Sequence, residues 1–215
     1  MNILITGAAG FIGYHLILKI LNKNLKVFGV DNINDYYDVK LKKDRINTLK
    51  KSKKFFFYKI DLNEYKKLNN IIKKNKIKII IHLAAQAGVR YSIENPRTYF
   101  KSNLEGFFNV LELSRHNKIK HLIYASTSSV YGDTKKFPLH ESNPTDFPLS
   151  FYAATKKSNE IMAHSYSYIY KLPTTGVRFF TVYGPFGRPD MALFKFTKNI
   201  INNQSIELFN NGRHL

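Results

Sequence analysis

The sequence predicts an α/β protein built on a doubly wound parallel sheet. Short apolar runs alternate along the 215 residues with longer segments whose apolar positions recur every three or four residues. A glycine-rich turn joins the first apolar run to the first helical segment. Small and hydroxyl residues follow later runs, as expected where parallel strands end beside a ligand.

The expected elements follow one another regularly. Apolar runs of strand length lie at residues 2–6, 26–30, 55–60, 78–83, 120–125, 173–180 and 206–209. Segments of helical period lie at residues 12–21, 39–51, 62–74, 96–116, 151–170 and 192–201. Pro96 suits the first turn of its helix, and residues 133–150 are polar and contain prolines, which indicates a loop. Strands that alternate with helices favour a parallel sheet.

The composition argues against several classes of protein. The chain contains no cysteine, so disulfides, thiol chemistry and cysteine-ligated metals are excluded. No stretch is long and apolar enough to span a bilayer, and glycines and charged residues interrupt residues 1–21, unlike a signal peptide. The net charge of +19 comes mostly from lysines scattered over predicted helix ends and loops. We therefore expect a cytoplasmic protein without a nucleic-acid or membrane partner and without a metal.

The glycine-rich turn has the spacing GxxGxxG, formed by Gly7, Gly10 and Gly13. Its position between a strand and a helix is typical of a dinucleotide site in a Rossmann-type sheet. Gly7 allows a tight turn, Gly10 lets the backbone approach a pyrophosphate, and Gly13 allows close packing of helix and strand. Phe11 and Ile12 open the helix, whose N-terminal N–H groups favour an anion.

Further cofactor contacts are expected at the ends of the next strands. Asp31 lies about 20 residues past the glycines, where a carboxylate binds the adenosine ribose hydroxyls. It would repel a 2′-phosphate, so we expect NAD rather than NADP. Asp61 and Leu62 follow the third strand and could edge the adenine. Ala84 and Ala85 follow the fourth strand, and their small side chains would let a cofactor lie close.

Tyr152 and Lys156 are four residues apart and therefore share one face of the predicted helix at 151–170. A lysine ammonium favours a phenolate, so we expect the pKa of Tyr152 to fall toward neutrality. The hydroxyl cluster at 126–129 ends the preceding strand. A hydroxyl that shares an alcohol's hydrogen bond with Tyr152, next to a dinucleotide, is suited to oxidising a secondary alcohol.

Longer strings of residues carry a resemblance to a known family. They are DNINDYYD at 31–38, HLAAQAGVRYS at 82–92, YAATKK at 152–157, RFFTVYGP at 178–185 and GRPDMA at 187–192. Together with GxxGxxG and YxxxK they resemble the extended short-chain dehydrogenase/reductases, and more closely the UDP-glucuronate 4-epimerases. The resemblance covers nearly the whole chain.

The resemblance implies a mechanism and residue roles. Tyr152 would be the base, Lys156 its partner and a ligand of the nicotinamide ribose, and Thr127 the catalytic hydroxyl. Tyr152 would take the proton of the sugar 4-OH while the C4 hydride passes to NAD. The 4-ketose would turn in the site and receive hydride on its other face, which converts UDP-glucuronate to UDP-galacturonate.

Such a 4-keto-uronate is a β-keto acid that can lose CO₂, so the site must hold the carboxylate. Ser128, Ser129 and Thr181 are candidate donors, and Arg90 and Arg188 are candidate cations. Related 4,6-dehydratases carry acidic residues after the catalytic Thr, and UDP-glucuronate decarboxylases carry a Glu in place of Ser129. The serines here favour an epimerase and leave a decarboxylase, or another nucleotide-sugar epimerase, as the alternative enzyme.

The resemblance also implies a domain plan. Residues 1–180 would form the NAD-binding domain, and residues 181–215 would begin a small substrate-binding domain that continues further in full-length members. Gly212-Arg213 resembles the start of a turn in that domain. A C-terminally truncated chain that binds NAD without productive turnover is therefore a second hypothesis. The helices at 96–116 and 151–170 resemble the family's dimer helices, which predicts a homodimer.

Overall fold

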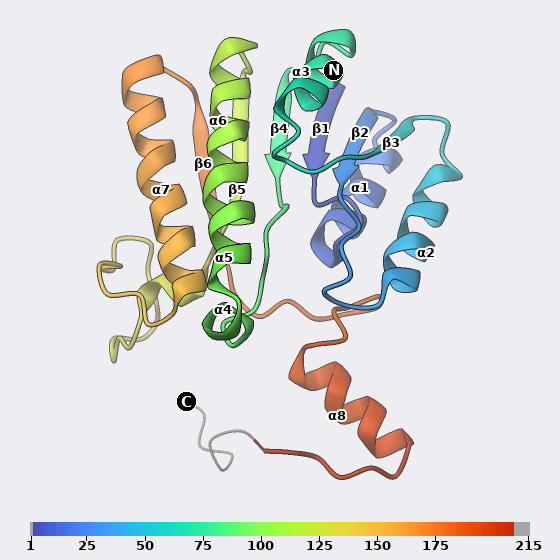
Figure 1. Cartoon of the computed structure of the whole chain (residues 1–215), viewed down its shortest axis with the longest axis vertical. Helices are drawn as coiled ribbons and strands as arrows, with labels where there is room; N and C mark the ends of the chain where they lie inside the picture. Colours follow the sequence, from blue (N-terminus) through green and yellow to red (C-terminus); the bar gives the residue numbers. More distant parts are fainter. Residues whose placement is uncertain (1, 209–215) are drawn as a thin grey trace.

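The computed structural model describes residues 2–208. Within them, the strands form one parallel sheet in the order β3-β2-β1-β4-β5-β6 (Figure 1). The strands are β1 (Asn2–Thr6), β2 (Lys26–Asp31), β3 (Phe55–Lys59), β4 (Ile79–His82), β5 (His121–Thr127) and β6 (Thr174–Phe179). The order reverses between β1 and β4, which is the switch point where doubly wound sheets bind ligands. The predicted fold class is confirmed.

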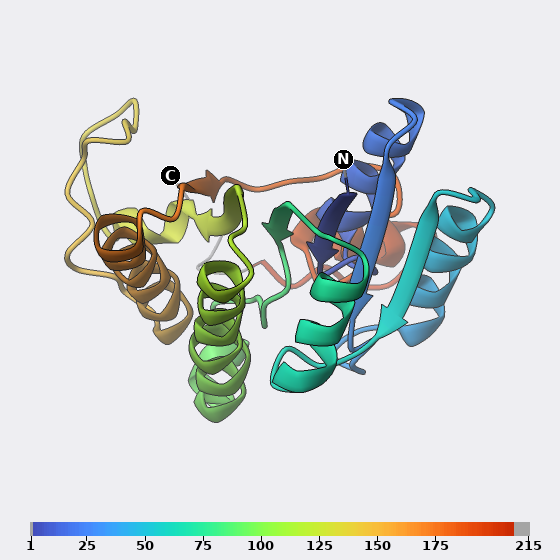
Figure 2. The ribbon, with the colours of Figure 1, turned by 90° about the horizontal axis from the view of Figure 1, so that it is seen from above.

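Helices cover both faces of the sheet (Figure 2). They are α1 (Phe11–Asn22), α2 (Val39–Lys50), α3 (Tyr65–Lys74), α4 (Tyr91–Glu94), α5 (Pro96–Tyr99), α6 (Gly106–His116), α7 (Phe151–Tyr170) and α8 (Ala192–Ile201). A π-helical segment, η1 (Phe100–Glu105), joins α5 to α6, and a 3-10 turn, η2 (Ser128–Tyr131), follows β5. α3, α6 and α7 pack on one face, and α1 and α2 on the other.

Two apolar cores hold these layers together. In the core under α3, α6 and α7, Leu4, Leu122 and Phe107 are fully buried. In the core under α1 and α2, Ile5 and Ile17 are fully buried. Burying one such side chain contributes roughly 1.5–3 kcal/mol, so the strands from β1 to β5 are strongly anchored to their helices.

The register brings the strand ends to one edge. Thr6, the last residue of β1, pairs with Val30 of β2 and with His82 of β4. Thr127, the last residue of β5, pairs with Phe179 of β6. The loops that follow these strands therefore emerge side by side, and α4 and α8 lie beyond the same edge (Figure 1).

Some expected elements differ from the structure. The helix expected at 96–116 contains the π segment, and the one expected at 62–74 begins only at Tyr65, because Asp61 Oδ1 accepts a hydrogen bond from Asn63 N–H and forms a turn. α4 was not expected. The strand expected at 206–209 is wrong for residues 206–208, which have no regular structure, and Phe209 lies outside the described residues, as does Gly212-Arg213.

No helix in the part of the chain that the structure describes is long and apolar enough to cross a membrane.

Candidate active site

A pocket of about 700 Å³ lies along the carboxyl edge of the sheet. Every residue that the sequence nominated for a catalytic, cofactor or substrate role lines it. These are Gly7, Gly10, Phe11, Ile12, Gly13, Asp31, Asp61, Leu62, Ala84, Ala85, Arg90, Thr127, Ser128, Ser129, Tyr152, Lys156, Thr181 and Arg188. Elements far apart in the sequence therefore converge on one site.

The glycine loop at this site is packed too tightly for side chains. Gly7 has a φ of +74°, and a Cβ there would lie 2.7 Å from Ala84 N. A Cβ on Gly13 would lie 2.2 Å from Gly7 O. Gly10 is the N-cap of α1 and supplies no side chain, so the first N–H groups of α1 are available to an anion. This geometry suits the pyrophosphate of a dinucleotide.

Asp31 is held by backbone groups at the end of β2. Its Oδ2 accepts a hydrogen bond from Ala9 N–H at 3.0 Å, and its Oδ1 accepts one from Ile33 N–H at 2.8 Å. Burial raises the pKa of Asp31, while these two donors and the charge of Lys42 act in the opposite direction. The carboxylate is thus oriented into the pocket beside the glycine loop, where a ribose would lie. Asp61 accepts a hydrogen bond from Asn32 Nδ2 at 2.9 Å.

The pair Tyr152 and Lys156 is presented by the first turns of α7. Ser150 caps this helix, because its Oγ accepts a hydrogen bond from Ala153 N–H at 3.1 Å. Lys156 is 2% exposed, and its Nζ donates to Ala125 O of β5 at 2.9 Å. Burial lowers the pKa of Lys156 to about 8. The lysine is therefore fixed between α7 and β5, close to its protonation midpoint.

The expected fall in the pKa of Tyr152 is wrong for this structure. Burial raises the pKa of Tyr152, because a phenolate loses its hydration there. A hydrogen bond with Thr127 and the charge of Arg188 act against burial without overcoming it. The groups that favour the phenolate in this state are thus Thr127 and Arg188. Lys156 is not among the groups that shift the pKa of Tyr152, and its Nζ donates to Ala125 O.

A partly buried ion pair ties α7 to the two strands beside it. Arg178 of β6 donates from Nε and Nη2 to the two carboxylate oxygens of Glu160, each at 2.9 Å. Ser126 of β5 donates to Glu160 Oε1 at 2.6 Å. Glu160 lies one turn after Lys156, so this contact ties the part of α7 that carries Lys156 to β5 and β6.

Sequence reasoning missed Asn103, which lies in η1. Its Oδ1 accepts from Gln86 N–H at 2.8 Å, and its Nδ2 donates to Gln86 O at 3.0 Å and to Thr155 Oγ1 at 3.1 Å. Asn103 therefore joins the loop after β4 to α7. A π segment often marks a functional position, but apolar periodicity does not reveal one.

Residues 180–191, here named the crossing segment, run from β6 across the carboxyl edge to α1 and α2 (Figure 1). His15 of α1 donates to Pro185 O at 2.8 Å, and Arg45 of α2 donates to Phe186 O and to Gly187 O. Arg45 is fully buried and also donates to Ala9 O at 2.8 Å.

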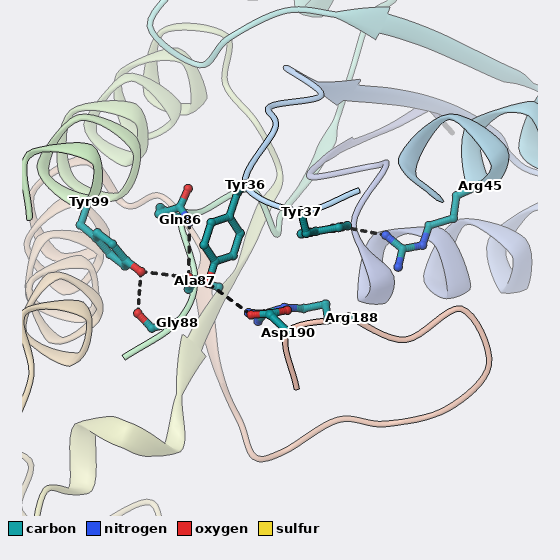
Figure 3. A network of polar contacts seen from close by, with 9 residues as sticks. All are labelled: Tyr36, Tyr37, Arg45, Gln86, Ala87, Gly88, Tyr99, Arg188 and Asp190. Atoms are coloured by element: carbon teal, nitrogen blue, oxygen red, sulfur yellow. Dashed lines mark hydrogen bonds and ion pairs between the residues drawn. The ribbon is translucent and has the colours of Figure 1, made fainter. Parts of the chain in front are cut away.

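The crossing segment carries Arg188 and Asp190 into a network of polar contacts (Figure 3). Arg188 pairs with Asp190 through Nε and Nη2, and Tyr36 donates to Asp190 Oδ2 at 3.2 Å. Sequence reasoning nominated Arg188 but neither Asp190 nor Tyr36. Their only signal lay in the DNINDYYD and GRPDMA strings, because the contact joins residues 154 positions apart.

The described residues contain no group of three or more His, Asp or Glu side chains that could hold a metal ion.

The sheet order, the glycine loop and the trio of Thr127, Tyr152 and Lys156 define a dinucleotide-binding protein of the short-chain dehydrogenase/reductase class. The sequence profile of the NAD dependent epimerase/dehydratase family matches residues 3–215. The chain belongs to that family, whose cofactor is NAD.

Relatives support this assignment. The chain is 59% identical over 212 residues to Protein CapI from Staphylococcus aureus, covering 99% of this chain and 63% of that protein. It is 50% identical to a probable UDP-glucuronate 4-epimerase from Rhizobium meliloti, covering 99% of this chain and 62% of that protein. The UDP-glucuronic acid 4-epimerase from Bacillus cereus, solved with UDP-glucuronic acid and NAD, superposes with a TM-score of 0.93 at 36% identity, over 99% of this chain and 67% of that one. The chain thus spans a little under two thirds of the length of these curated relatives.

Proposed function

We propose that this chain carries the NAD-binding and catalytic part of a nucleotide-sugar 4-epimerase that converts UDP-glucuronate to UDP-galacturonate. The observation that carries the proposal is the meeting of Thr127, Tyr152 and Lys156 with the glycine loop in one pocket, with Ser128 and Ser129 rather than acids beside them. The names of the R. meliloti and B. cereus relatives support the choice of substrate.

NAD, when bound, supplies the hydride acceptor and donor at C4 of the sugar. Gly7, Gly10, Phe11, Ile12 and Gly13 would hold its pyrophosphate with backbone groups. The adenosine of NAD would lie against Asp31, Asp61 and Leu62. The small side chains of Ala84 and Ala85 would leave room for the remainder of the cofactor. Tyr152 and Lys156 would hold the nicotinamide ribose.

Tyr152 takes the proton of the sugar 4-OH and later returns it. Thr127 shares the hydrogen bond to the same oxygen, and the two groups therefore hold the ketone oxygen of the intermediate. Ala125 O holds the amino group of Lys156 between α7 and β5, on the same helix as Tyr152. Residues of α7 and β5 thus move one proton at one atom, in both directions.

Retention of the carboxylate is the second task of the site. Ser128, Ser129 and Thr181 line the pocket as hydroxyl donors, and Arg90 and Arg188 line it as cations. A carboxylate held by such donors keeps its C–C bond away from the alignment that decarboxylation of a β-keto acid requires. Neither Ser128 nor Ser129 can act as the acid of a dehydratase.

The test is an NMR time course of UDP-glucuronate incubated with the protein and NAD. Formation of UDP-galacturonate supports the proposal. Formation of UDP-xylose and CO₂ would replace it with a decarboxylase. A parallel incubation with UDP-glucose separates a uronate epimerase from another nucleotide-sugar epimerase.

A non-catalytic role is the second candidate function, favoured by one observation. α8 carries no buried residue and the crossing segment leads into it, so residues from 181 onward add little packed structure within the described range. We propose that they begin a substrate-binding part that follows an NAD-binding domain at 1–180. Separate titrations with NAD and with UDP-glucuronate decide: NAD binding without UDP-sugar binding favours the non-catalytic role.

We also propose a homodimer formed by the helical layer of η1, α6 and α7. Apolar side chains are exposed there, including Phe100, Phe108, Ile161 and Ile169, at 57%, 46%, 59% and 59% of their surface. Pairing two such layers would bury them in a four-helix bundle. Light scattering that shows a monomer would refute this. The proposed compartment is the cytoplasm, and the proposed use of the product is surface polysaccharide synthesis.

A further inference from the structure

We infer that Asp190 and Tyr36 are positioning residues that hold the guanidinium of Arg188 in the pocket, so that it reads an anionic group on the sugar. This inference rests on the proposed function for its ligand, a nucleotide sugar with a carboxylate at C6. It begins from the pairing of Arg188 with Asp190 inside the crossing segment, where both side chains are 24% exposed.

The pairing fixes the orientation of the arginine. Arg188 donates from Nε to Asp190 Oδ1 at 3.0 Å and from Nη2 to Asp190 Oδ2. A carboxylate that binds a guanidinium by two parallel hydrogen bonds sets the plane of the group. Arg188 lines the pocket, and Nη1 is the guanidinium nitrogen that takes no part in this pairing. An unpinned arginine at the same place would instead sample many rotamers.

Tyr36, in the loop after β2, is the third member of this network. Its hydroxyl donates to Asp190 Oδ2 at 3.2 Å. Burial and the charge of Asp190 raise the pKa of Tyr36 to about 12, so the hydroxyl stays a donor at neutral pH. Gly88 leaves room for it, since a Cβ there would lie 2.6 Å from the Tyr36 hydroxyl. The loops after β2, β4 and β6 therefore meet at this contact (Figure 3).

The location of Arg188 connects the network to the chemistry. Arg188 lines the same pocket as Tyr36 and Tyr152, and its charge lowers the pKa of Tyr152 against the effect of burial. An anion held by Arg188 would therefore lie near the proton-transferring phenol. The negative charge of Asp190 offsets the positive charge of Arg188. We therefore expect an anion to bind only where it can accept a hydrogen bond from the guanidinium N–H groups.

The test compares Asp190→Asn and Tyr36→Phe with Tyr91→Phe as the matched control. The Tyr91 ring lies 4.8 Å from the Tyr36 ring, and this control removes a neighbouring hydroxyl while the one bound to Asp190 stays. Calorimetry on the NAD-loaded protein measures affinity for UDP-glucuronate and for UDP-glucose, which is neutral at C6. We expect Asp190→Asn and Tyr36→Phe to weaken UDP-glucuronate about 10-fold, the typical cost of one charge-assisted hydrogen bond. UDP-glucose and NAD affinities should stay unchanged.

The double variant adds a stricter criterion. Because Tyr36 acts through Asp190, the double variant should bind UDP-glucuronate no more weakly than Asp190→Asn alone. Equal losses for both sugars, or no loss for either, would overturn the inference.

A readout without sugar separates this inference from the proposed function. In protein labelled at arginine Nε, the Arg188 signal is assigned by its loss in Arg188→Lys. We expect its N–H to exchange with water faster in Asp190→Asn and in Tyr36→Phe, but not in Tyr91→Phe. An unchanged exchange rate would refute the positioning role. A wild-type protein that binds no UDP-sugar would refute the proposed function, whatever the exchange rates are.

Discussion

The protonation of Tyr152 is set by opposing local effects. Burial favours the neutral phenol, whereas Thr127 and Arg188 favour the phenolate. The sequence predicted that Lys156 would favour the phenolate of Tyr152, because the spacing of the two residues places them on one face of α7. Spacing could not show that the ammonium would instead donate to Ala125 O. Tertiary contacts, more than the motif itself, decide the electrostatics of this site.

Replacing Thr127 by Val should therefore raise the pKa of Tyr152 further. The active form of the base is the phenolate, so the rising limb of the pH–rate profile should move to higher pH. At pH 7 we expect a loss in kcat on the order of 100-fold. Steady-state kinetics across pH measure this. The control is Ser126→Ala, which removes a hydroxyl bound to Glu160 and should leave the rising limb of the pH–rate profile at the wild-type pH. A rising limb that also stays at the wild-type pH in Thr127→Val would contradict the role given to Thr127.

Replacing Lys156 by Met should stabilise the fold while abolishing turnover. Burial lowers the pKa of Lys156 to about 8 from 10.5, so the charged form is destabilised in the folded state. Below pH 8 this cost is complete; as pH rises from 8 to 10.5 the folded protein loses the proton first, and the cost fades. We expect a gain of about 1–3 kcal/mol at pH 7, after the lost hydrogen bond to Ala125 O is subtracted. Denaturant unfolding at pH 7 and pH 10 should show that the gain in the free energy of unfolding is smaller at pH 10. A gain that does not change with pH would contradict this prediction.

The secondary-structure elements were predictable to different degrees. Runs of strand length located all six strands of the sheet in the described range; β1 to β5 are rich in buried apolar residues, whereas β6 is exposed in its middle. The π segment was not predictable from apolar periodicity, and neither was the contact of Asn103 with Gln86 across 17 residues. The anchoring of the crossing segment was not predictable either, because Arg45 reads as one more cation on a basic surface helix.

The attachment of α7 to the sheet offers a test at this scale. Glu160→Gln leaves Arg178 without its charged partner at a site where the two side chains are 15% and 20% exposed. We expect a loss of about 2–4 kcal/mol in the free energy of unfolding, measured in denaturant. Asp44→Asn removes an equivalent partner from the exposed pair with Lys40, and it should leave the midpoint unchanged. Equal effects in both variants would contradict a special role for the Glu160 contact.

Across the whole molecule, packing is uneven. The cores lie between β1–β5 and the helices α1, α2, α3, α6 and α7, whereas β6 is largely exposed in its middle and α8 has no buried residue. The pocket draws on both regions, because the glycine loop belongs to the packed part and Arg188 to the crossing segment. Arg45 joins the two regions, together with His15 and Tyr36.

Replacing Arg45 by Met should therefore uncouple the glycine loop from the crossing segment. We expect faster hydrogen exchange of the amides at 184–190 and also at 8–10, with the strands β1 to β5 unaffected. Arg115→Met, which removes an arginine paired with Glu112 on α6, serves as the control. Exchange that rises in only one of the two segments would contradict the coupling.

The double contact of Arg45 bears on how long a cofactor stays bound. Arg45 bonds both the glycine loop at Ala9 and the crossing segment at Phe186 and Gly187, so in the proposed NAD-bound protein we expect the two segments to loosen together when the cofactor leaves. In that protein we expect NAD to stay bound for longer than a sugar does. The proposed epimerisation depends on such a difference in lifetimes, because each hydride returns to the sugar from which it came.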